Sequence, residues 1–169
     1  AIGLPVLFFC FRLKESLNVK NRLQGSIFST FLTFGVIIKN RLFMSYVGIQ
    51  SFLLGSMFAY IAASPFIFQS FYGLSAFVFS LCFGANGAAL VIGANVGGKL
   101  PNRKALAIGV LAFVVAALYT IAVLIIQPYW LFVEIGFFAM LLLMGITFPA
   151  ISSLAMESER QYADRKSVV

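Results

Sequence analysis

The 169-residue sequence contains no histidine, two cysteines and five acidic residues. Metal sites are built mainly from histidine, cysteine and carboxylate side chains, and here no two cysteines or acids stand at ligand spacing. The same shortage leaves no nucleophile paired with a base, which a membrane enzyme would need. The sequence therefore predicts no metal, no cofactor and no catalytic residues, and it disfavours an enzyme.

Charged residues are also scarce, at 10% of the chain, whereas 62% of the residues are hydrophobic. Soluble domains average about 25% charged residues, and a soluble fold could not cover this much apolar surface. The net charge of +7 does not indicate nucleic-acid binding, because the basic residues lie between apolar runs instead of forming one basic face. The sequence predicts an all-α integral membrane protein whose partner is the lipid bilayer, with no nucleic acid.

The longest run without a charged residue covers residues 42–98. A transmembrane helix needs about 20 apolar residues, so this run is long enough for two crossings and a turn. Because a residue that precedes proline is pushed out of the helical region, Ser64-Pro65 is expected to end the first crossing. The predicted spans are residues 42–63 and 74–98, joined by an outer turn at residues 64–73.

A second hairpin is predicted downstream, as a cytoplasmic turn at residues 99–104, a span at 105–126, an outer turn at 127–130, a span at 131–156 and a cytoplasmic segment at 157–169. All twelve lysines and arginines lie within residues 12–41, 99–104 and 160–166. Cytoplasmic loops of membrane proteins carry an excess of these residues, so the three segments are placed in the cytoplasm. The chain is predicted to be multi-pass, with four complete transmembrane helices in two hairpins.

The apolar run at residues 1–11 precedes the basic residues Arg12 and Lys14. A signal peptide has the opposite order, so this run is predicted to be the end of an earlier transmembrane helix, and the chain is expected to be a fragment. Residues 12–41 form a predicted cytoplasmic linker. Within it, residues 27–38 are too short to cross, and two interpretations stay open: a helix lying in the membrane interface, or a loop helix packed on the protein's own cytoplasmic face.

Small residues repeat every four positions in the second span, at Ala85, Ala89, Gly93 and Gly97. Such a strip lets another helix backbone approach closely, and we interpret it as a helix-packing surface in preference to a direct role in transport. Asn86 in the same span must find a partner, because the bilayer interior offers no water.

Glu134 is the only acidic residue inside the predicted spans. A charge at the centre of a membrane costs about 2.5–3.5 kcal/mol on insertion scales, so such residues are candidates for function. Glu134 lies one turn inside Trp130, a predicted anchor at the outer interface. Two roles therefore stay open for Glu134: a solvated or helix-start position near the outer surface, or possible coupling of an ion, such as a proton, to transport.

Several stretches resemble one family of transporters. Residues 60–69 (YIAASPFIFQ), 72–75 (YGLS) and 79–86 resemble the seventh and eighth helices of Bcr/CflA-type drug-resistance transporters in the major facilitator superfamily. Residues 13–17 (LKESL) resemble the Leu-Pro-Glu-Thr-Leu that follows the sixth helix of these transporters. Gly145 with Pro149, followed by Ala155 and Met156, resembles the tenth helix of the same family.

The cytoplasmic turn at residues 98–104 (GKLPNRK) is similar to a degenerate copy of the superfamily's Gly-x-Leu-x-Asp-Arg loop. The resemblance implies a gating loop that contains Gly98, Asn102 and Arg103. Asn102 stands where the motif has aspartate, and Arg103 matches the arginine.

The resemblance also implies a fold of two six-helix halves with substrate bound between them near the midplane of the membrane. This chain would be a partial major-facilitator half, containing the end of helix six and helices seven to ten, and its partner would be the missing amino-terminal half. The implied function is a secondary active drug:proton antiporter of the bacterial inner membrane, with a small-molecule substrate and protons. An alternative is a membrane assembly or anchoring protein that uses the small-residue helix as an interface.

Two sets of residues are candidates for the substrate-binding surface, one in each of the spans 42–63 and 131–156. They are Gln50, Met57, Phe58 and Ile61, in a region that the family resemblance implies as cavity lining, and Met140, Met144 and Phe148, which repeat at four-residue spacing. Methionine and aromatic side chains adapt to varied apolar ligands. The same stripe would also suit packing against lipid or helices, so both interpretations stay open.

The last six residues, 164–169 (DRKSVV), depart from the family, which would continue with Gly-x-Ala-Ser-Ala and an eleventh helix. They resemble one reading frame of a common sequencing-library adapter. We therefore expect them to be non-native.

Overall fold

The computed structural model describes residue 35, residues 37–127 and residues 129–168 of the chain, with side chains up to Glu159. The predicted span end at residues 1–11 lies outside this part. So does the cytoplasmic linker before residue 35, which includes most of the interfacial helix predicted at residues 27–38.

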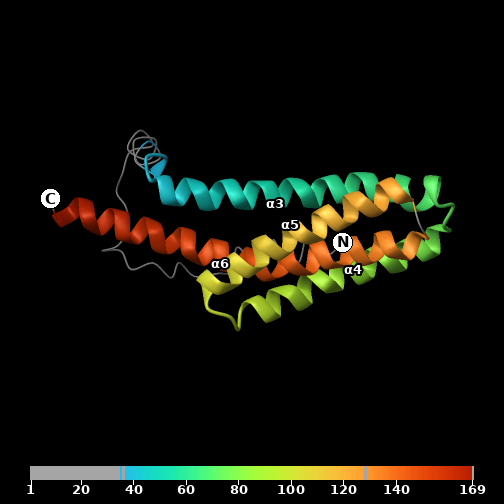
Figure 1. The fold of residues 1–169 in the computed structure, drawn as a ribbon. Helices are drawn as coiled ribbons and strands as arrows, with labels where there is room; N and C mark the ends of the chain where they lie inside the picture. The colour runs from blue at the N-terminus through green and yellow to red at the C-terminus, as the bar shows by residue number, and fades with distance from the viewer. Residues whose placement is uncertain (1–34, 36, 128, 169) are drawn as a thin grey trace, which may run out of the picture. The chain divides into compact units, whose positions relative to one another are not determined.

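The described elements are all helical. They are α3 (Arg41–Pro65), the π-helix η2 (Phe66–Phe71), α4 (Ala76–Gly97), α5 (Asn102–Ile126) and α6 (Trp130–Val168) (Figure 1). Four helices in this part of the chain are long and apolar enough to cross a membrane. The predicted all-α membrane fold, with four spanning helices in two hairpins, is confirmed.

The first outer turn is shorter than predicted. Helix α3 does not end at Ser64 but runs through Pro65, whose φ of −62° and ψ of −40° are helical, and continues as η2. Proline lacks its own amide N–H but its φ suits a helix, so the chain can pass through it where the carbonyls of the preceding turn find other donors. Here the Phe66 amide donates to the Ala63 carbonyl. Within η2, the amide of Tyr72 donates to the Ile67 carbonyl at 3.1 Å. The reversal then falls at Gly73, whose φ is +67°.

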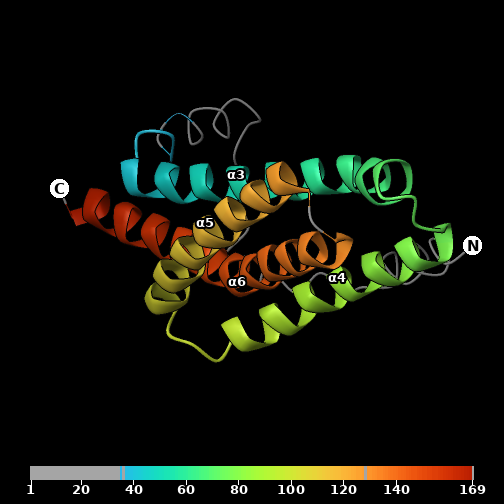
Figure 2. The same ribbon diagram turned by 45° about the vertical axis from the view of Figure 1, so that its right-hand side comes forward.

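Helix α6 is the centre of this four-helix arrangement. It packs extensively against α4 and α5 and also contacts α3. Figures 1 and 2 show α6 between α3 and α4, with α5 crossing over it. The side chains on α6 that are most deeply buried include Val133, Met144 and Ile151. An element in contact with three neighbours accounts for the high burial of α6 relative to the other spans.

Glycines set the distance between α4 and α6. A Cβ atom added at Gly93 would collide with the backbone carbonyl of Leu142, and one at Gly97 would collide with that of Ile146. The contact is reciprocal, because a Cβ at Gly145 would meet the Leu90 carbonyl. The two backbones therefore touch directly, as expected for small residues at a transmembrane helix contact.

Helices α5 and α6 use a glycine and a threonine on each side. Gly109 of α5 lies against the Thr147 hydroxyl, and Gly136 of α6 lies against the Thr120 hydroxyl. Each hydroxyl also donates to the carbonyl four residues earlier, at 2.6 Å for Thr147 and 2.8 Å for Thr120. These buried polar groups are therefore satisfied inside their own helices.

Asn40 joins the amino-terminal end of α3 to the carboxy-terminal part of α6. Its side-chain oxygen caps α3 by accepting from the Phe43 amide at 3.3 Å. Its Nδ2 donates to the Ser158 carbonyl at 3.3 Å and to Glu159 Oε1 at 2.9 Å. One asparagine thus caps one helix and fixes it to the next.

We predict that Gly93→Leu destabilises the protein, whereas Gly87→Leu on the same helix does not. Overpacking costs about 1–3 kcal/mol, and at Gly93 the obstacle is backbone, which cannot rotate away. A Cβ at Gly87 meets nothing within 4 Å. Thermal unfolding and monodisperse yield in detergent would measure both variants. Equal stability of the two would contradict the role given to Gly93.

Candidate functional site: a buried polar cluster beside an apolar cavity

Three helices each contribute one polar side chain to a buried cluster. The amide Nδ2 of Asn86 on α4 donates to the Tyr60 hydroxyl on α3 at 2.9 Å and to Glu134 Oε2 on α6 at 3.2 Å. Asn86 is 0% exposed, Tyr60 7% and Glu134 8%. The sequence singled out Asn86 and Glu134 separately, but only the fold shows that they are partners.

Two atoms of this cluster have no hydrogen-bond partner among the described residues. They are Asn86 Oδ1 and Glu134 Oε1, and both are acceptors when the glutamate is ionised. Ser64 Oγ, one turn after Tyr60 on α3, is likewise buried without a partner. Buried polar groups are nearly always hydrogen-bonded, so unsatisfied atoms gathered at one place indicate a site for chemistry or binding.

Aromatic rings enclose the cluster. The Tyr60 ring lies 5.0 Å from that of Phe137 and 5.9 Å from that of Phe83, measured between centroids. Phe68 of η2 packs on Phe137 at 6.0 Å and is itself fully buried. These rings exclude water and lower the local dielectric, which strengthens the polar interactions inside. The Glu134 side chain is therefore buried between helices rather than solvated at the outer surface.

An apolar cavity of about 280 Å³ lies next to the cluster, between α3, α5 and α6. Tyr60, Phe137 and Met140 line it, together with Thr120 and Leu124 of α5. A narrower cleft of about 10 Å³ adjoins the same residues and is lined in addition by Met57 and Met144. The two cavities share Tyr60 with the polar cluster.

The structure brings together three of the seven residues predicted for substrate binding, Met57, Met140 and Met144. Phe58 and Ile61 are 60% and 39% exposed and do not line the cavities beside the polar cluster. Gln50 and Phe148 are half-buried, and Phe148 packs against the core. The sequence reasoning missed Tyr60, Phe113 and Phe137, because aromatic residues are frequent throughout the chain.

The small-residue strip predicted on α4 is also only partly buried. Ala89, Gly93 and Gly97 are buried, whereas Ala85 is exposed. A helix turns 100° per residue, so the contact line drifts from Ala85 to Asn86 over several turns. Asn86 thereby lies on the line of contact itself.

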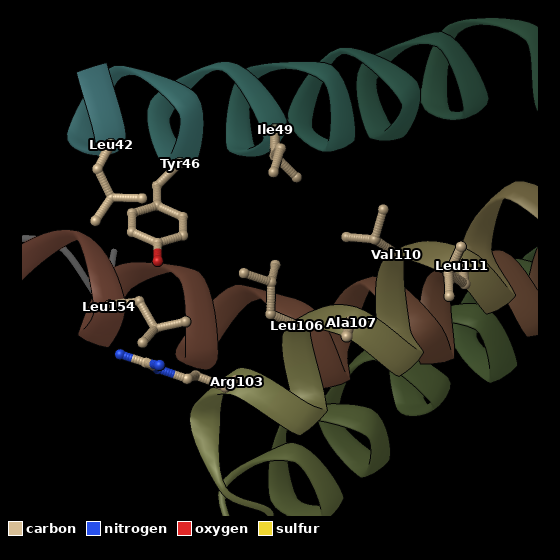
Figure 3. A pocket seen from close by; sticks show the side chains of 9 residues that line it. All are labelled: Leu42, Tyr46, Ile49, Arg103, Leu106, Ala107, Val110, Leu111 and Leu154. Atoms are coloured by element: carbon tan, nitrogen blue, oxygen red, sulfur yellow. The ribbon is translucent and has the colours of Figure 1, made fainter.

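A second apolar cavity, of about 590 Å³, lies between the amino-terminal parts of α3 and α5 (Figure 3). Leu42, Tyr46 and Ile49 of α3 line it opposite Leu106 and other residues of α5. The Tyr46 hydroxyl points from α3 toward α6 (Figure 3).

The predicted gating loop borders this second cavity. Arg103, at the start of α5, lies beside Leu154 of α6 (Figure 3). The neighbouring Asn102 donates to Ser153 Oγ at 2.8 Å, so the loop is fixed to α6. Gly98 ends α4, where its amide donates to the Ala94 carbonyl at 3.0 Å.

Comparison with known proteins identifies the family. A sequence profile described as the Major Facilitator Superfamily matches residues 1–163. The chain belongs to the Major Facilitator Superfamily. This superfamily consists of transporters, so membership indicates membrane transport rather than catalysis.

One curated relative in this superfamily is the uncharacterized MFS-type transporter YdgK of Bacillus subtilis (strain 168). It is 32% identical over 170 residues, which cover 98% of this chain. The chain spans 42% of the length of that relative. No solved structure matches the chain.

We predict that Tyr60→Phe destabilises this superfamily member by about 1–3 kcal/mol, the usual cost of leaving a buried donor unsatisfied. The variant keeps the ring contacts with Phe83 and Phe137 but removes the oxygen that accepts from Asn86. Tyr119→Phe is the matched control, because it removes an exposed hydroxyl that donates to the Phe132 carbonyl at 3.3 Å. Thermal unfolding in detergent compares the two. A larger loss in Tyr119→Phe would show that the cluster is not a stabilising network.

Proposed function

We propose that the protein to which this chain belongs is a secondary active transporter that exports lipophilic drugs or small metabolites in exchange for protons. The proposal rests on two neighbouring apolar cavities that share Tyr60, Phe137 and Met140 in their lining. Met57 and Met144 line the smaller of the two. Flexible methionine and flat aromatic surfaces accommodate ligands of varied shape, as a multidrug site requires.

We further propose that the chain supplies helices seven to ten of a Bcr/CflA-type transporter. Support comes from the Ser64-Pro65 segment and the YGLS sequence at residues 72–75, which resemble that family. An amino-terminal half would complete the substrate site. The exposed Phe58 and Ile61 on α3 are available to face that half, and the superfamily binds substrate between its halves.

Three further assignments belong to the same proposal. Arg103 and Asn102 would act in gating, since their loop is attached to α6 through Ser153. The basic ends of the helices would face the cytoplasm, by the positive-inside rule. The membrane would be a bacterial cytoplasmic membrane, in keeping with a Bacillus relative.

We favour transport over the alternative of a membrane assembly or anchoring protein. That alternative requires the small-residue strip of α4 to be available to a partner. Gly93 and Gly97 already pack against α6 within the chain.

The test is an efflux assay of the complete protein in a bacterial host that lacks its main drug pumps. We predict that Met140→Trp, which would narrow the cavity of about 280 Å³, reduces resistance to bulky substrates about tenfold, an effect of about 1.4 kcal/mol. Met156→Trp is the control, because Met156 is 70% exposed.

Two outcomes would contradict this proposal. Absence of pH-dependent efflux of any lipophilic drug or small metabolite by the expressed wild-type protein would count against an antiporter. Unchanged substrate range in Met140→Trp would remove the cavity from the substrate path.

A further inference from the structure

We propose that Glu134 and Asn86 form a carboxyl–amide pair that binds one proton, with Tyr60 holding the amide in place. The pair is complete when Glu134 is protonated and loses one hydrogen bond when the proton leaves. The link from this proton to substrate export rests on the transport function proposed above, whereas the existence of the proton site does not depend on that function.

The hydrogen-bond inventory of the pair carries the proposal. An asparagine amide has two donor hydrogens on Nδ2 and an acceptor oxygen, Oδ1. Both donors are used, one by the Tyr60 hydroxyl at 2.9 Å and one by Glu134 Oε2 at 3.2 Å. What remains is one acceptor on each partner, Asn86 Oδ1 and Glu134 Oε1, and both are buried without a partner.

Two acceptors cannot bond to each other, but a single proton makes them complementary. A protonated carboxyl presents one donor and one acceptor, as an amide does. A proton on Oε1 would turn that oxygen into a donor and supply what the Asn86 oxygen lacks. The carboxylate form leaves both buried oxygens without a donor from the protein, and each such group costs about 1–3 kcal/mol.

Among the described side chains, no cation offsets a negative charge at this position. The titratable groups that face Glu134 are the Tyr60 hydroxyl from α3 and the Cys82 thiol from α4, and neither supplies a positive charge. The lysines and arginines in the described part of the chain lie near the ends of the helices, at residues 39–41, 99–104 and 160–166. A buried carboxylate is stable only when it is paired and fully hydrogen-bonded.

A metal ion fits the cluster less well than a proton does. Hard cations take six or more oxygen ligands, usually with several carboxylates or waters. The described residues contain no group of three or more metal-binding His, Cys, Asp or Glu side chains, and aromatic rings occupy the space around Tyr60.

The cluster lies where a proton could affect helix packing. Its three members come from α3, α4 and α6, so the pair and the Tyr60 bond join three spans at one point. Loss of the proton would weaken this joint and favour a conformation in which water reaches Glu134. A transporter that alternates between two conformations would thereby exchange the proton as it moves.

Glu134→Gln tests the proposal, because a glutamine amide presents the donor and the acceptor of the protonated carboxyl permanently. We expect the variant to fold and to be as stable as the wild type in acidic buffer. In alkaline buffer the wild type should lose stability and the variant should keep it. The measurement is thermal unfolding of the complete purified protein across a pH series.

Infrared difference spectroscopy provides a second measurement that does not depend on transport. The wild type should lose a protonated-carboxyl C=O band between acidic and alkaline buffer, and Glu134→Gln should lack that band. Glu157→Gln, at an exposed position near the cytoplasmic end of α6, should retain it. Asn86→Ala keeps the carboxyl group and should therefore keep the band.

The outcomes separate the two proposals. A band that disappears in Glu134→Gln supports the proton site even if the complete protein exports no drug. A pH difference spectrum identical in the wild type and Glu134→Gln overturns it, even if the protein is an active exporter. An ionised Glu134 bridged to Asn86 by water would show no such band and would also overturn it.

Discussion

Direct backbone contact between α4 and α6 is the constraint on which the rest of this structure depends. Lipid is as apolar as the side chains it would replace, so close packing and hydrogen bonds must hold transmembrane helices together. Gly93, Gly97 and Gly145 permit that packing by leaving room for carbonyl groups of the facing helix. Helix α6 then also accepts α5, through the glycine and threonine contacts at Gly109 and Gly136.

The same contact determines which polar groups meet. The two helices run in the same direction, with Gly93 opposite Leu142 and Gly97 opposite Ile146. About two turns toward the amino-terminal ends of both helices, this register brings Asn86 and Glu134 together. Helix α3 is attached differently, by polar contacts of Asn40 near one end and of Tyr60 toward the other. The cavities open between these attachments, along the face that α3 shares with α5.

The predictable features are those that depend on composition and local order. The absence of charge over residues 42–98 and the grouping of lysines and arginines indicated four crossings in two hairpins, which the structure confirms. Boundaries were less predictable, because α3 passes through Pro65 where a stop was expected. Whether a proline ends a helix depends on whether the carbonyls of the preceding turn find other donors, and here the Phe66 amide donates to the Ala63 carbonyl.

By itself, the sequence determined that this chain is a membrane protein, how many helices of spanning length follow residue 41, and which polar residues enter the bilayer. Those properties follow from the free-energy cost of placing charged side chains and unpaired backbone groups in lipid. That cost depends on the residues of each segment and not on its neighbours. Only the tertiary structure decided that Glu134 is buried against Asn86 and Tyr60, and that Met57 meets Met140 and Met144 while Phe58 is exposed. These facts depend on the rotation and register of helices distant in sequence, which the glycine contacts set and which no single segment encodes.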